Sequence, residues 1–257
     1  MVAGNEPIER LDMRSVLGKT DMILDAFTIY DNSLSLAELV RRTGLPKTTV
    51  HRICRVSTTW GVLERDTDGY RLGLRLFELG QRVPRQRIVR DAAHPYLHDL
   101  LFKTKAVVHL AVLDGLDAMV IERLSPYRAQ TRLTQVAGRM PLHCTAVGKA
   151  LLAFSHPSIV TEVMRKGLRR RTPYTITSAL LFTQALERAR STGVTTEDEE
   201  MHVGYLGVGA PIFGFDKTLI AAISATAPVH SSSVASLSPT VAKTAVAISA
   251  ALTARAT

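Results

Sequence analysis

Short polar and basic side chains crowd one stretch of the sequence, LPKTTVHRICR, in which no acidic residue occurs. They are Lys47, Thr48, Thr49, His51, Arg52 and Arg55. Such side chains donate hydrogen bonds to phosphates and base edges, and an acid among them would be repelled by phosphate. We expect Thr48, Thr49 and Arg52 to contact base edges. Lys47, His51 and Arg55 are expected to hold phosphates.

The surrounding sequence predicts the elements that would present this stretch to DNA. Ser35 is an N-cap with Glu38 three residues later, and Gly44 is a helix stop. After RTGLP, Pro46 suits the first turn of the next helix, and two strand-like runs then flank the hairpin signal DTDG. A charge run alone would fit a solvated face, but the turn spacing and the hairpin favour a winged helix-turn-helix, with Arg71 of the wing on the DNA backbone.

A second set of polar groups would suit a small anion. Thr145 can cap a helix that opens at Ala146 and Val147, where free N–H groups and the helix dipole attract negative charge. Ser224 and Thr226 are two residues apart in a predicted strand, so both hydroxyls point to one face. If that face meets the helix start, the donors converge on a carboxylate. Alternatively, Thr145 is only a cap and the two hydroxyls satisfy backbone groups.

The remaining polar groups predict no metal, cofactor or catalytic site. Four consecutive acids from Glu197 to Glu200 cannot all face one ion, so a solvated loop with one acid turned inward is expected. His202 beside them is isolated. Cys144 directly follows His143, and neighbours in a strand point to opposite faces, so a packed thiol is expected rather than a nucleophile–base pair.

Composition sets the broad class. The 257 residues allow one large domain or two ordinary ones, and 46% hydrophobic residues supply a core. A formal net charge of +9 favours a polyanionic partner. Two cysteines make no disulfide or metal pattern, the N-terminus lacks the apolar core of a signal peptide, and no apolar run approaches the ~20 residues that span a bilayer. We expect a cytoplasmic protein with no membrane partner.

The second half of the chain mixes strands and helices irregularly. The run AVVHLAVLDGLDAMVIERL predicts a hairpin, and GYLGVGAPIF and TLIAAISATAP predict two more core strands. Helical patterns lie near 145–154, 156–166, 179–191 and 238–255, and an earlier one over 74–90 is interrupted by Pro84. Without regular βαβ alternation, this predicts an α+β domain around an antiparallel sheet.

Five segments, in their order and spacing, resemble IclR-family transcriptional regulators. They are SLAELVRRTGLPKTTVHRI, GYRLGLRLFELG, PLHCTAVGKALLAF, TEDEEMHVGYLGVGAPIF and AAISATAP. The resemblance covers nearly the whole chain and implies two domains. An N-terminal all-α winged helix-turn-helix would be joined by a linker helix to a C-terminal α+β GAF-like domain with an antiparallel sheet. We place a flexible segment at 1–13, the DNA-binding domain at 14–73, the linker helix at 74–93 and the effector-binding domain at 94–257.

The resemblance also implies contacts for a small-molecule effector. It transfers them to Ala146, Val147, Glu197, Gly207, Ser224 and Thr226, with Asp198 as the alternative if the acidic run is shifted. Family members often have cysteine where Gly207 stands, so the glycine is expected to enlarge the pocket or remove a contact. They tend to have leucine where Ser57 stands, so the rear of the recognition helix is expected to pack loosely.

These patterns predict a sequence-specific transcriptional regulator that binds double-stranded DNA at a pseudo-palindromic operator as a dimer or tetramer. A small organic acid would change its operator binding or its contact with polymerase. The resemblance implies control of a catabolic operon and includes both repressors and activators. The alternative is an enzyme that acts on a small acid, with the N-terminal domain as a targeting module. Against it, the sequence has no nucleophile–base pair, metal-ligand spacing or phosphate-binding glycine motif.

Overall fold

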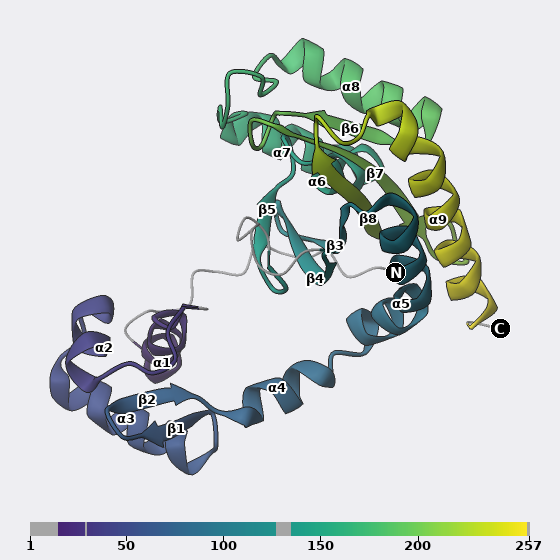
Figure 1. The fold of residues 1–257 in the computed structure, drawn as a ribbon. Coiled ribbons are helices and arrows are strands. Elements are labelled where there is room, and N and C mark those ends of the chain that lie inside the picture. Colours follow the sequence, from purple (N-terminus) through teal and green to yellow (C-terminus); the bar gives the residue numbers. More distant parts are fainter. Residues whose placement is uncertain (1–14, 29, 127–134, 256–257) are drawn as a thin grey trace. The chain divides into compact units, whose positions relative to one another are not determined.

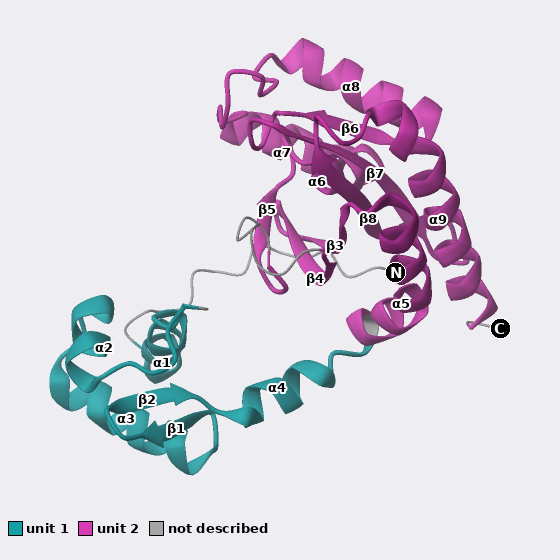
Figure 2. Ribbon diagram, in the orientation of Figure 1, with its two compact units in different colours: residues 1–84 teal, residues 85–257 magenta. Residues whose placement is uncertain are grey.

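The computed structural model describes residues 15–28, 30–126 and 135–255 (Figure 1). The predicted flexible segment at residues 1–13 lies outside this described part. The chain forms two compact units, residues 1–84 and residues 85–257 (Figure 2). The elements of the first unit are α1 (Val16–Asp25), α2 (Leu36–Thr43), α3 (Lys47–Thr59), β1 (Leu63–Asp66), β2 (Gly69–Leu72) and α4 (Leu74–Gln81).

Local signals set the helix ends of the first unit as the sequence predicts. The Ser35 hydroxyl accepts the Glu38 N–H at 3.1 Å at the start of α2, and Gly44, with φ 68°, ends it. Helix α3 begins directly after Pro46. Strands β1 and β2 pair antiparallel as a wing, and the backbone of Leu34 pairs with β2 as well. The predicted winged helix-turn-helix fold is therefore confirmed.

The rear of α3 is well packed, which corrects the expectation that Ser57 would leave it loose. Val50, Ile53 and Cys54 lie in the core of the unit, as predicted. Ser57 is only 3% exposed, and its carbonyl accepts the Val62 N–H at 2.9 Å. Helix α3 continues through Thr59, because tertiary packing outweighs the weak helix propensity of its last residues.

The predicted linker helix is two helices. Helix α4 ends at Gln81, and α5 (Pro84–Thr104) begins at the proline, which suits a first helical position. Helix α5 runs on without a break through Pro95, so position 94 lies within it. No residue of α4 is buried, and Leu74 and Phe77 are exposed. The proposed limits of the functional domains at 73 and 93 stay predictions.

The second unit is an α+β structure around one antiparallel sheet. Its strands are β3 (Val107–Asp114), β4 (Asp117–Leu124), β5 (Arg139–Pro141), β6 (Thr195–Asp198), β7 (Tyr205–Phe213) and β8 (Leu219–Pro228). They pair in the order β5-β4-β3-β8-β7-β6. The further helices are α6 (Ala146–Ala153), α7 (Pro157–Lys166), α8 (Ala179–Thr192) and α9 (Val234–Ala254). The two shortest strands, β5 and β6, were not predicted.

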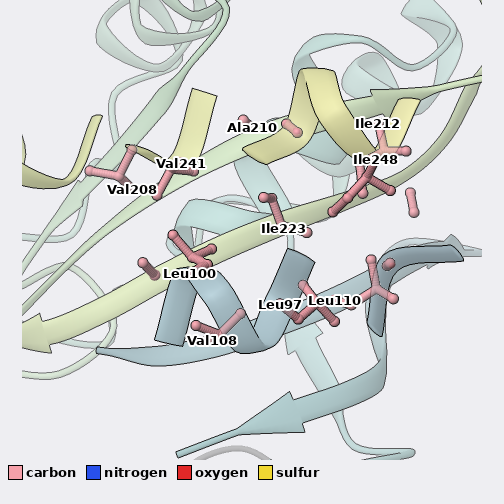
Figure 3. Packing of buried hydrophobic residues seen from close by; sticks show 14 of the residues in the cluster. Leu97, Leu100, Val108, Leu110, Val208, Ala210, Ile212, Ile223, Val241 and Ile248 are labelled. Carbon is pink, nitrogen blue, oxygen red and sulfur yellow. The ribbon is translucent and has the colours of Figure 1, made fainter. Parts of the chain in front are cut away.

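Helices pack on both faces of this sheet. On one face, α5 and α9 share a core with β3, β7 and β8, in which Leu97, Leu100 and Val241 meet Val108 and Ile223 (Figure 3). On the other face, α6, α7 and α8 share a second core with the sheet. Because side chains alternate along a strand, the neighbours of the first-face residues point towards α6.

Helix α9 corrects the statement that no apolar run approaches the length that spans a bilayer. By length and composition, this 21-residue helix would fit a bilayer, with a mean hydropathy of 1.2. Its residues Leu237, Val241 and Ile248 are instead buried in the core shared with the sheet. Packing on the sheet therefore accounts for the apolar residues of α9.

Candidate functional site

The polar residues of α3 share one exposed surface, as the sequence predicts. Val50, Ile53 and Cys54 fix the buried side of the helix. Thr49 is half-buried, and the other members of the set are exposed: Lys47, Thr48, His51, Arg52 and Arg55. Their spacing of three to four residues puts them on adjacent turns. We call this set the α3 surface.

The cations of the α3 surface differ from the two arginines of α2 in their partners. Arg41 pairs with Glu38 at 2.6 Å, and Arg42 pairs with Asp31 at 2.6 Å. The Arg42 guanidinium holds the pKa of Asp31 well below its usual range. By contrast, the cations of the α3 surface make no ion pair within the described part of the chain. Arg41 and Arg42, which precede the acid-free stretch, are thus neutralised by acids that lie earlier in the chain.

The wing arginine Arg71 has an acidic neighbour within the wing. Arg71 lies opposite Glu64 in the β1–β2 register and pairs with it at 2.9 Å. Both side chains are largely exposed, and such surface pairs contribute only ~0–1 kcal/mol. Arg71 is therefore not free for a phosphate in this structure, although little energy holds it on Glu64.

In the second unit, two rows of cross-strand neighbours run over β3, β8, β7 and β6. The first row is Val107, Thr226, Gly207 and Glu197. The second row is His109, Ser224, Gly209 and Thr195. The rows are two residues apart on each strand, so all eight residues face the same side, towards α6.

The start of α6 is seated on these rows. The Thr145 hydroxyl accepts the Gly148 N–H at 3.1 Å, as predicted for a cap. The Thr195 hydroxyl donates to the Ala146 carbonyl at 2.7 Å, and a Cβ on Gly209 would lie 2.4 Å from that same oxygen. The N–H groups of Ala146 and Val147, at the first two helical positions, make no hydrogen bond to any described residue.

A cavity of about 50 Å³ lies between the rows and the start of α6. By this measure one water needs only ~10–15 Å³, so the cavity has room for a small molecule. Its lining residues are Val107, His109, Met140, Thr145, Ala146, Val147, Glu197, Met201, His202, Tyr205, Ser224 and Thr226. An open groove of about 500 Å³, which includes Lys105 and His230, shares Val107, Tyr205 and Thr226 with it.

Two acids of the run from Glu197 to Glu200, which begins in β6, are buried, whereas one was expected. Glu200 pairs with Lys149 in the middle of α6, and the Lys149 ammonium also donates to the Thr196 carbonyl at 3.0 Å. Glu197 accepts the Met201 N–H at 3.0 Å, and burial raises its pKa to about 7. The single lysine inside the apolar run AVGKALLAF could have predicted a buried acidic partner, because a buried charge needs a partner of opposite charge.

Two histidines also line the cavity, and the sequence did not assign them a role. Burial lowers the pKa of His109 to about 3, and the Ser224 hydroxyl lies 3.5 Å from its Nδ1. Burial lowers the pKa of His202 as well. Both imidazoles are therefore neutral at pH 7. Cys144 is a buried thiol whose pKa burial raises to about 12, so it is a packed residue as expected.

Comparison with known proteins assigns both units to one family. The description "Bacterial transcriptional regulator IclR C-terminal" fits residues 81–250, and "IclR helix-turn-helix domain" fits residues 16–67. This chain belongs to the IclR family. It is 31% identical to the HTH-type transcriptional regulator KipR of Bacillus subtilis over 80% of this chain and 83% of KipR. It is 29% identical to the regulator XynR of Escherichia coli over 79% of this chain and 81% of XynR.

A solved structure extends the IclR comparison to the fold. The IclR homolog from Microbacterium hydrocarbonoxydans, complexed with 4-hydroxybenzoate, is 31% identical, with a TM-score of 0.88. The match covers 95% of this chain and 100% of that one. These relatives are transcriptional regulators and not enzymes. The chain is thus a DNA-binding regulator with a ligand-binding C-terminal domain.

The structure brings most of the predicted IclR effector contacts together. Six of them line the cavity: Thr145, Ala146, Val147, Glu197, Ser224 and Thr226. Gly207 borders it, because a Cβ there would lie 3.1–3.2 Å from the side chains of Ala146, Glu197 and Thr226. Asp198, the alternative contact, is not among the lining residues, since strand alternation leaves it exposed beside the buried Glu197.

The two glycines of β7 should differ in their tolerance of alanine. Gly209→Ala should lower the stability of the second unit by ~1–3 kcal/mol, because its methyl group would strike the backbone of α6. Gly207→Ala is the matched control, since its methyl group would lie 3.1–3.2 Å from its nearest neighbours, the side-chain atoms of Ala146, Glu197 and Thr226, and so demands a much smaller displacement. Urea unfolding followed by circular dichroism checks this. Equal losses in both variants would contradict the close seating of α6.

Glu197 should make stability depend on pH. Its folded pKa of about 7 exceeds the ordinary 4.5, so its favourable contribution is complete below pH 4.5 and is lost as pH rises through 7. Glu197→Gln should therefore gain about 3 kcal/mol over wild type between pH 5 and pH 8.5, by urea unfolding at each pH. Asp198→Asn, which removes the exposed neighbouring carboxyl of β6, is the control. A constant difference between Glu197→Gln and wild type would refute the raised pKa.

Proposed function

We propose that this chain is a sequence-specific regulator whose operator binding or polymerase contact changes when a small organic acid enters the cavity. The carboxylate would accept hydrogen bonds from the N–H groups of Ala146 and Val147, which have no other described partner. The Ser224 and Thr226 hydroxyls line the same cavity and add donors. This set of donors at the start of α6 is the observation that carries the proposal.

The charges around the cavity support an anionic ligand. The positive end of the α6 dipole favours a carboxylate by ~0.3–1 kcal/mol or more where it is buried. Glu197 does not oppose this below pH 7, because burial keeps its carboxyl protonated there. Lys105 in the adjoining groove would attract an acid towards the cavity. The bound 4-hydroxybenzoate of the Microbacterium relative is itself a carboxylate.

In the complex with DNA, the α3 surface would enter the major groove of a pseudo-palindromic operator. Thr48, Thr49 and Arg52 would contact bases. Lys47, His51 and Arg55 would contact phosphates, and Arg71 would join them after leaving Glu64. The exposed apolar residues of α4 support self-association as a dimer or tetramer, which would set two α3 helices in successive grooves. The site of action would be the cytoplasm, on a catabolic operon.

The acid would act by shifting populations of the regulator. It moves the equilibrium only if it binds one arrangement more tightly than the other, so its differential affinity sets the size of the response. Operator release, tighter operator binding and altered polymerase contact all satisfy this linkage. Both repression and activation are therefore compatible with the same cavity.

Arg52→Ala should lower operator affinity by ~1–3 kcal/mol and relax specificity, because it removes a base contact. Fluorescence anisotropy with duplexes tiled across the DNA beside the gene, with random DNA as competitor, measures both. Arg41→Ala is the matched control, since Arg41 is already paired with Glu38. If Arg52→Ala separated operator from random DNA as well as wild type, its base contact would be refuted.

Arg55→Ala should instead reduce the salt dependence of operator affinity.

The double variant Ser224→Ala/Thr226→Val should lose roughly tenfold in affinity for a responsive acid, since two hydroxyl donors are removed. Its operator affinity without acid should be unchanged. Calorimetry with a panel of small carboxylic acids that includes 4-hydroxybenzoate measures the first quantity, and anisotropy measures the second. Thr196→Val, with its side chain exposed on β6, is the control. An undiminished response of the double variant would contradict the pocket assignment.

A further inference from the structure

A polar groove of about 500 Å³ adjoins the cavity where β3 and β7 begin and β8 ends. Val107, Tyr205 and Thr226 line both the groove and the cavity. These three residues are half-buried rather than buried, so solvent reaches the boundary between the two hollows. A ligand that is too long for the cavity would therefore extend past them into the groove.

The groove lining contains cationic and neutral polar groups, and none of its described residues is acidic. Beyond the shared residues, it consists of Thr104, Lys105, Ser125, Pro126, Pro228, His230, Ser231 and Ser232. Two of the hydroxyls already donate hydrogen bonds, Thr104 to the Leu100 carbonyl at 2.7 Å and Ser231 to the Pro228 carbonyl at 3.0 Å. The Lys105 ammonium, with three N–H donors and a full charge, is therefore the group that would hold an anion in this groove.

Lys105 directly follows α5 in a backbone conformation that favours glycine. Its φ is 54°, and its N–H donates to the Leu101 carbonyl at 2.8 Å. Gly44 and Gly193 end α2 and α8 in the same way, with φ 68° and 75° and an N–H that donates to the carbonyl four residues earlier. Lysine is less favourable than glycine in this conformation, so the stability of the turn does not explain its side chain.

The Lys105 ammonium makes no ion pair with any described residue. It lies 4.1 Å from the centroid of the Phe102 ring. Both side chains are exposed, so this cation–π contact is weak, and the flexible lysine side chain can leave it for a bound anion. Lys103 differs, because its ammonium already pairs with Asp99 at 2.6 Å.

We propose that the effector carries a second anionic group at its far end, which Lys105 holds in the groove while the first carboxylate occupies the start of α6. Four residues of β8 separate Ser224 in the cavity from Pro228 in the groove, a span of about 13 Å in an extended strand. The preferred class is therefore long dicarboxylic acids, over short ones and over monocarboxylic acids of equal length. This inference rests on the proposed carboxylate site and adds a contact for the opposite end of the ligand.

A length series of acids tests the inference by calorimetry on the full chain. The matched pairs are succinate with butyrate, adipate with hexanoate, pimelate with heptanoate, and suberate with octanoate. Wild type should prefer the dicarboxylate in at least one of the three longer pairs by roughly tenfold, the scale of one charge-assisted hydrogen bond. It should show no such preference for succinate, whose two carboxylates are too close together to reach both sites.

Three variants of Lys105 separate its charge from its place in the turn. Lys105→Met should reduce the preference for the long dicarboxylate to near unity, and Lys105→Arg should retain it. Lys105→Gly should also remove the preference, yet raise the unfolding temperature, because glycine suits the left-handed conformation. A purely structural role for Lys105 would not combine these two results. The matched control is Lys103→Met, which removes an equal charge from a lysine that is paired with Asp99.

The outcomes separate this inference from the proposed function. If wild type binds acids without preferring the long dicarboxylates, or if the preference survives the loss of the Lys105 charge, the inference is overturned and the carboxylate site stands. An equal loss of preference in Lys103→Met would assign it to the net charge of the protein and would also overturn the inference. If no acid of any length binds, the proposed effector class fails and this inference fails with it.

Discussion

The close seating of α6 on β7 is the contact on which the rest of the second unit depends. Gly207 and Gly209 leave space on the sheet surface, and the Thr195 hydroxyl bonds the Ala146 carbonyl that fills it. This contact aims the first N–H groups of α6 along the two rows of cross-strand neighbours. The cavity exists because the helix start and the rows meet at this distance. Larger side chains on β7 would separate them and disperse the donors.

The same strands connect the cavity with the helix that starts at the boundary between the two units. Ser224 faces the cavity, whereas its neighbour Ile223 lies in the opposite core with Leu97 and Leu100 of α5. A small shift of β8 therefore reaches α5 through one layer of packed side chains. Packed cores move between discrete arrangements, so a displacement of β8 would be accompanied by a change in the packing of α5. Pro84 begins α5 at the boundary, which gives this helix a defined start.

Residues that act on near neighbours in the sequence allowed the local structure to be predicted. Contacts between segments that are distant in the sequence could not be predicted. Ser35, Gly44 and Thr145 act on residues within four positions, so their roles as caps and stops could be predicted. Strand β6 is only four residues long and depends on its pairing with β7. Its sequence is too short for an alternation of polar and apolar residues to predict a strand. The same limit hid the burial of Glu200, the place of His202 in the cavity lining and the pairing of Arg42 with Asp31, since each depends on a partner from elsewhere in the chain.

The two ends of the cavity, one at the start of α6 and the other at Met201, His202 and Tyr205, differ in how mutations can change them. At the start of α6 the cavity is bordered by backbone N–H groups, which every residue except proline supplies, so most substitutions there leave these donors in place. The other end relies on the side chains of Met201, His202 and Tyr205, which single mutations replace outright. Drift in this gene should therefore alter the chemistry of the second end more readily than it removes the donors at the start of α6. A regulator built this way can be reassigned to new metabolites while its mode of response is inherited.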